Sequence, residues 1–110
     1  MTEPVIDEAT FRELQETAGA EFVAELVDTF LEEAPGMLAA LRQACAAGDT
    51  DAFRRAAHSL KSNSLTFGAA PLAAAARALE LGGIGSEAAI DALQCSFDTA
   101  AVRLKELRDA

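Results

Sequence analysis

Apolar side chains recur at intervals of three or four residues along most of this chain, a spacing that places them on one face of a helix. The longest stripe lies within residues 20–47 and consists of Phe22, Val23, Leu26, Val27, Phe30, Ala34, Leu38, Leu41 and Cys45. A helix with one apolar face is stable in water only when that face packs against other elements. The pattern therefore predicts an all-α protein with a shared core.

The same spacing predicts five helices, at about residues 7–17, 20–47, 50–67, 71–81 and 86–108. Short segments that contain glycine join most of them. Four amphipathic helices with short connections indicate an antiparallel four-helix bundle, and the additional short N-terminal helix is expected to pack over one end. All 110 residues are expected to form a single domain.

Several residues are expected to mark the ends of these helices. Asp7, Ser86 and either Asp49 or Thr50 are candidates for N-terminal caps, because their side chains can accept hydrogen bonds from free backbone N–H groups. Gly68 is a natural stop for the third helix.

Pro35 lies inside the second predicted helix, where a proline removes one backbone donor and crowds the carbonyl of Leu31. The apolar pattern resumes directly after it, so we expect a kink at this point and not a break.

The charge is strongly acidic and unevenly distributed. With 18 acidic and 9 basic residues, the net charge is −9 at pH 7. Repulsion from phosphates then argues against nucleic-acid binding. Ten of the acidic residues lie within residues 3–33, whereas Arg54, Arg55 and Lys61 surround His58, the single histidine. From charge alone, this cationic patch is equally well an ordinary solvated helix face.

No signal-peptide pattern is present at the start, and no apolar run approaches the length that spans a membrane. We therefore expect a cytoplasmic protein without membrane insertion. Cys45 and Cys95 are expected to be unpaired thiols, Cys45 in the core and Cys95 partly exposed.

Helical geometry places His58 on the outer face of the third predicted helix. The buried face of that helix consists of Phe53, Ala57, Leu60, Ser64 and Phe67. At roughly 100° per residue, His58 lies about 140° from the centre of this face. Arg54, Lys61, Ser62 and Leu65, at three-, four- and seven-residue spacings, share its strip of surface.

This strip suits a nucleophile that meets an anionic group on a partner protein. A neutral imidazole attacks, the Lys61 ammonium balances charge, the small Ser62 leaves room, and the exposed Leu65 offers an apolar contact. Arg54 and Leu65 are therefore candidate partner-binding residues. From the residues alone, a surface histidine without a function remains the alternative.

The stretch His58-Ser59-Leu60-Lys61-Ser62, followed by Phe67-Gly68-Ala69, resembles the signature of histidine-containing phosphotransfer (HPt) domains. The resemblance implies a four-helix domain that carries phosphoryl groups in a multistep phosphorelay. His58 would accept the group from a receiver domain or a hybrid sensor histidine kinase and pass it to a response-regulator receiver. Most family members have glycine where this chain has Ser62, so we expect slightly tighter access without loss of function.

The nitrogen that attacks needs a free lone pair, so the other ring nitrogen should donate its proton to a fixed acceptor. Glu80 is the candidate, because it follows the inward-facing Leu79 at the edge of the fourth predicted helix. The resemblance supports this choice, since HPt domains commonly carry Gln or Glu 22 residues after the histidine. A solvated glutamate near a helix end is the alternative interpretation.

The sequence has neither a phosphate-binding glycine loop nor an acidic cluster for Mg²⁺, so we expect no cofactor or metal in this chain and no ATP-dependent kinase activity. The resemblance implies that a partner receiver supplies both Mg²⁺ and the phospho-aspartate. It also implies a monomer that acts as a phosphocarrier, and whether such a carrier counts as an enzyme stays open.

Two other functions fit the same pattern. The chain could be the phosphoacceptor domain of a chemotaxis-type histidine kinase, which shares the bundle and a His-x-x-Lys motif. It could also be a helical adaptor that binds a partner without phosphate. A metal-carboxylate bundle is rejected, because that site needs a Glu-x-x-His motif on each of two helices and the chain has one histidine.

Overall fold

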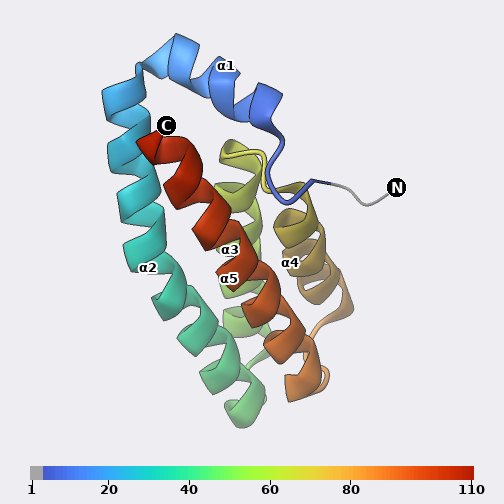
Figure 1. Cartoon of the computed structure of the whole chain (residues 1–110). Helices are drawn as coiled ribbons and strands as arrows, with labels where there is room; N and C mark the ends of the chain where they lie inside the picture. The colour runs from blue at the N-terminus through green and yellow to red at the C-terminus, as the bar shows by residue number, and fades with distance from the viewer. Residues whose placement is uncertain (1–3) are drawn as a thin grey trace.

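The computed structural model describes residues 4–110, which form five helices and no strand (Figure 1). The helices are α1 (Glu8–Ala18), α2 (Ala20–Ala47), α3 (Thr50–Thr66), α4 (Ala70–Gly82) and α5 (Glu87–Asp109). The predicted all-α class is confirmed. None of these helices combines the length and the apolar character that crossing a membrane requires.

Helices α2 to α5 form an antiparallel bundle, and α1 crosses over one of its ends (Figure 1). Each bundle helix packs against its neighbours in the chain, and α5 closes the ring by packing against α2 as well as α4. Helices α3 and α5 therefore occupy opposite corners of the bundle. The arrangement confirms the predicted four-helix bundle with a short extra helix.

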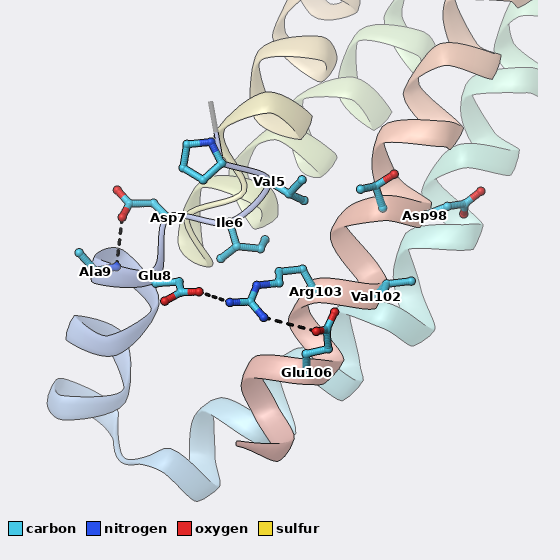
Figure 2. Close-up of a pocket in the computed structure, with 11 residues that line it drawn as sticks. Val5, Ile6, Asp7, Glu8, Ala9, Asp98, Val102, Arg103 and Glu106 are labelled. Carbon is cyan, nitrogen blue, oxygen red and sulfur yellow. Dashed lines mark hydrogen bonds and ion pairs between the residues drawn. The ribbon is translucent and has the colours of Figure 1, made fainter. Parts of the chain in front are cut away.

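The first turn of α1 is capped locally and is joined to α5 by an ion pair. The Asp7 carboxylate caps α1 by accepting from the Ala9 N–H at 3.1 Å. Arg103 of α5 forms ion pairs with Glu8 and with Glu106 (Figure 2). These contacts line a hollow of about 850 Å³ between this segment and α5.

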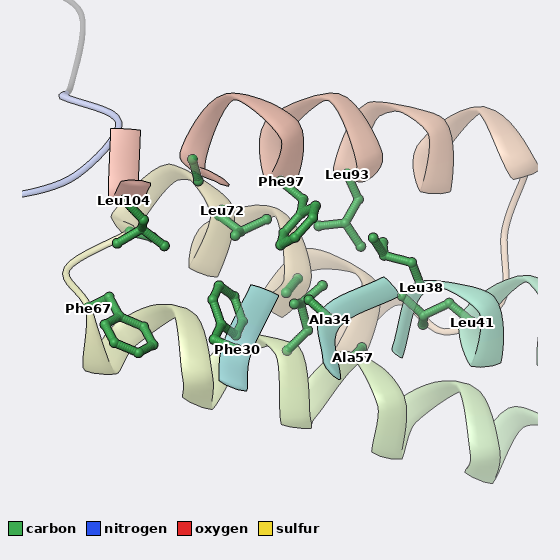
Figure 3. Close-up of a cluster of buried hydrophobic side chains, with 14 of the residues drawn as sticks. Phe30, Ala34, Leu38, Leu41, Ala57, Phe67, Leu72, Leu93, Phe97 and Leu104 are labelled. Carbon is green, nitrogen blue, oxygen red and sulfur yellow. The ribbon is translucent and has the colours of Figure 1, made fainter. Parts of the chain in front are cut away.

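The core fills the space between the four long helices, and Phe30 of α2 lies near its centre (Figure 3). The ring centroid of Phe30 is 5.4 Å from that of Phe67, which follows α3, and 5.8 Å from that of Phe97 on α5. The second pair meets edge to face, a favourable arrangement for aromatic rings. One aromatic side chain thus links three parts of the bundle.

The helix limits agree with the predicted ones to within one or two residues. Asp49 caps α3, since its carboxylate accepts from the Ala52 N–H at 3.1 Å. Ser86 occupies the N-cap position of α5, but its side chain makes no capping hydrogen bond. Helix α2 continues through Pro35 without a break.

Three residues of the predicted α2 stripe are not fully buried, and one of them, Leu26, packs against the core from a half-buried position. Phe22 is 48% exposed, because the adjacent Val23 takes the inward position in the first turn of α2. Cys45 is only partly buried, because Ala44 takes the inward position near the other end. The Cys45 sulfur lies 3.8 Å from the Gly85 carbonyl oxygen, at the edge of the core. Cys95 is exposed.

The turn between α3 and α4 holds α1 in place. The Asp7 N–H donates to the Gly68 carbonyl oxygen at 2.8 Å, and Gly68 has a φ of +76°. A Cβ added to Gly68 would lie 2.9 Å from the Asp7 carbonyl oxygen and from Cβ of Thr10. Glycine is therefore required here by backbone conformation and by close packing.

We expect Gly68→Ala to lower the free energy of unfolding by more than about 1 kcal/mol, because it adds a steric conflict to the strain of a positive φ. Urea unfolding followed by circular dichroism measures this loss. Gly48→Ala is the control, since Gly48 also follows a helix, has a φ of +69° in the left-handed region, and has no described atom within 4 Å of an added Cβ. Equal losses in the two variants would contradict the close-packing argument.

Candidate functional site

Helix α3 is buried on one face and exposes His58 on the other. Phe53, Ala57 and Leu60 are buried on its inner face, as predicted. Ser64 is also fully buried, and its hydroxyl donates to the Leu60 carbonyl oxygen at 2.6 Å, so this polar group is satisfied. The His58 side chain is 60% exposed, which confirms the predicted outward orientation.

Glu80 of α4 reaches across to α3 and contacts two of its side chains. One carboxylate oxygen, Oε2, forms a short contact with Nδ1 of His58. The other, Oε1, accepts a hydrogen bond from Nζ of Lys61 at 2.7 Å. The side chains of Glu80 and Lys61 are only 13% and 20% exposed, so this ion pair is shielded from bulk water much more than the imidazole is.

The Lys61 hydrogen bond is the main reason why the pKa of Glu80 lies below its ordinary value, and the contact with His58 acts in the same direction against partial desolvation. Glu80 is therefore ionised at neutral pH and can only accept hydrogen bonds. The proton between Glu80 and a neutral His58 then belongs to Nδ1, which leaves the lone pair on Nε2 free.

His58 and Glu80 also line a shallow hollow of about 410 Å³, together with Arg54, Arg55 and Ser59. Arg54 is well exposed and lies 3.5 Å from an Asp51 carboxylate oxygen. Arg55 is exposed and forms no ion pair within residues 4–110. The structure thus brings two arginine residues to the same hollow as the imidazole.

The remaining residues of the predicted strip lie on the surface of α3. Ser62 is exposed, and Leu65 is 56% exposed, one of the most exposed large apolar side chains in residues 4–110. The sequence argument did not assign Arg55 or Ser59 to this strip. Arg55 precedes His58 by three residues, so the spacing rule that selected Arg54 also contained the signal for it.

Metal-binding residues do not cluster near His58. Within residues 4–110, no three His, Cys, Asp or Glu side chains come close enough together to hold a metal ion.

Comparisons with known proteins agree with the geometry. The family model of the Hpt domain matches residues 25–110. The crystal structure of histidine-containing phosphotransfer protein B (HptB) from Pseudomonas aeruginosa PAO1 superimposes with a TM-score of 0.86 and 31% sequence identity, over 98% of this chain and 97% of that one. No curated protein sequence matches. On the family match and this structural likeness, the chain belongs to the family of Hpt domains.

Proposed function

We propose that this domain is a phosphocarrier that accepts a phosphoryl group on Nε2 of His58 and passes it on in a multistep phosphorelay. The donor is the phospho-aspartate of a receiver domain, free or part of a hybrid sensor histidine kinase, and the acceptor is an aspartate of a response-regulator receiver. The observation that carries this proposal is the contact between Glu80 and Nδ1, because it leaves Nε2 as the nucleophile on an exposed ring. Family membership supports it.

The transfer step follows from the tautomer of His58. The Nε2 lone pair attacks phosphorus and forms an N–P bond, while the bond between phosphorus and the aspartyl oxygen breaks and the carboxylate leaves with the electron pair. The ring keeps its Nδ1 proton and gains positive charge. Glu80 stabilises that charge as it develops, because its carboxylate already accepts from Nδ1.

The neighbouring residues have distinct roles in this proposal. Lys61 supplies positive charge to the site, and its hydrogen bond lowers the pKa of Glu80. Ser62, one turn after His58, leaves room for the approaching receiver. Arg54 and Leu65 contribute to the surface on which that receiver docks. Mg²⁺ at the receiver's own site completes the charge balance.

His58→Gln is expected to abolish phosphate acceptance and leave the fold intact, since the side chain is largely exposed. The domain is mixed with a phosphorylated receiver and Mg²⁺, and acid-labile, base-stable phosphate is measured on both forms of the protein. Circular dichroism tests the fold of the variant. Equal labelling of the variant would place the phosphoacceptor elsewhere, whereas equal receiver binding without labelling of either form would support a helical adaptor.

Glu80→Ala is expected to slow phosphate acceptance by about ten- to a hundredfold, because the imidazole loses the carboxylate that fixes its tautomer. Glu80→Gln should retain more activity than Glu80→Ala, because the amide oxygen can still accept from Nδ1. Single-turnover transfer rates measure both effects. Wild-type rates in Glu80→Ala would mean that this glutamate is only a structural partner of Lys61.

Leu65→Asp is expected to weaken receiver binding by about tenfold or more, because it places a charge where an apolar contact is proposed. Val102→Asp on α5 is the matched control, since Val102 is also exposed, at 61%, and its helix occupies the opposite corner of the bundle. Calorimetric titration of both variants with the same receiver measures the difference. Equal affinities in the two variants would mean that the docking surface excludes Leu65.

A further inference from the structure

Two arginines that make no contact with Glu80 line the hollow beside His58. Arg54, Arg55 and Ser59 line it together with the imidazole and Glu80. A water molecule takes up about 30 Å³ in the liquid, so a hollow of about 410 Å³ has room for a phosphoryl group and for movement of a guanidinium.

Lys61 is poorly placed to be the cation that meets this phosphoryl group. Its ammonium lies 2.7 Å from Glu80, and both side chains are largely shielded from solvent. Turning Lys61 towards the phosphoryl group would break its hydrogen bond to Oε1 of Glu80, whose other oxygen contacts His58. That hydrogen bond helps to hold the carboxylate against the ring, so Lys61 already has a role in the site that a turn towards the phosphoryl group would end.

The two arginines are free of such a conflict. Within residues 4–110, Arg54 is engaged only by Asp51 at 3.5 Å, and both side chains are well exposed, so this pair contributes little to stability and separates easily. Arg55 forms no ion pair in the described part of the chain. Around the helix axis, Arg55 and Lys61 lie about 60° to opposite sides of His58, so Arg55 approaches the ring from the side away from Lys61.

We infer that Arg54 and Arg55 contact the phosphoryl oxygens of phosphorylated His58, while Lys61 acts indirectly, by holding the Glu80 carboxylate in place beside the ring. A guanidinium presents a planar fork of donors that matches two phosphoryl oxygens at once, which an ammonium does not. This inference rests on the proposed function, since it concerns the phosphorylated state of His58.

The test uses the domain alone, so that contacts with the phosphoryl group are separated from docking of a receiver. Phosphoramidate serves as the donor: the Nε2 lone pair attacks phosphorus, the P–N bond of the reagent breaks, and ammonia leaves. The pH titration of the phosphoryl group on His58 is then followed by ³¹P NMR. A cation in contact with the phosphoryl oxygens favours the dianion and lowers the titration midpoint.

We expect Arg54→Ala and Arg55→Ala each to raise this midpoint by about half a pH unit, a modest shift because the site is open to solvent. Arg55→Lys should restore part of the shift, since it keeps the charge but loses the planar fork. Lys105→Ala on α5 is the matched control for net charge, because Lys105 is exposed on the helix at the opposite corner of the bundle. Its midpoint should equal that of the wild type.

An unchanged midpoint in both arginine variants would overturn the inference, as would a shift produced by Lys61→Ala alone. A shift of equal size in Lys105→Ala would also overturn it, because the effect would then come from net charge and not from contact. Failure to phosphorylate His58 at all is a different result, which would overturn the proposed function and this inference with it.

Discussion

Glu80 can reach His58 only because α3 and α4 are antiparallel and pack closely against each other. Both buried faces carry small side chains at this contact, with Ala57 on α3 and Ala76 on α4 fully buried. The midpoint in sequence between His58 and Glu80 is Ala69, the buried residue that immediately precedes α4. The Ala69 N–H donates to the Ser64 carbonyl oxygen at 2.9 Å, which fixes where α3 ends and α4 begins. A change of one residue in this turn would rotate Glu80 by about 100° around α4 and away from the imidazole.

The helices and the orientation of His58 could be predicted from the sequence because they depend on local periodicity. Buried positions repeat every three or four residues through α3, so the outward direction of His58 follows from helix geometry without knowledge of any other helix. Pro35 shows that tertiary packing can override a local helix-breaking signal. A proline in the interior of an isolated helix is strongly unfavourable, yet packing on both sides of it keeps α2 continuous.

Other features depend on how helices meet, and the sequence does not contain that information in a readable form. Phe22 lies at the junction of α1 and α2, where the path of the chain decides whether Phe22 or Val23 points inward. Lys61 was expected to face an incoming phosphoryl group. Its partnership with Glu80 appears only when the register between α3 and α4 is known. Periodicity therefore identifies which residues are on the surface, while tertiary register decides which surface residues interact.

The pairing of Glu80 with both His58 and Lys61 also affects how the charge of the site changes when His58 is phosphorylated, as proposed. Before transfer, the carboxylate neutralises Lys61, and the two arginines give the site a positive charge. After the proposed transfer to His58, a dianionic phosphoryl group is attached to a ring that has gained positive charge by keeping its Nδ1 proton. The formal charge of the site then falls by only one unit. The positive ring thus offsets half of the added negative charge, and Glu80 stabilises that ring through its contact with Nδ1.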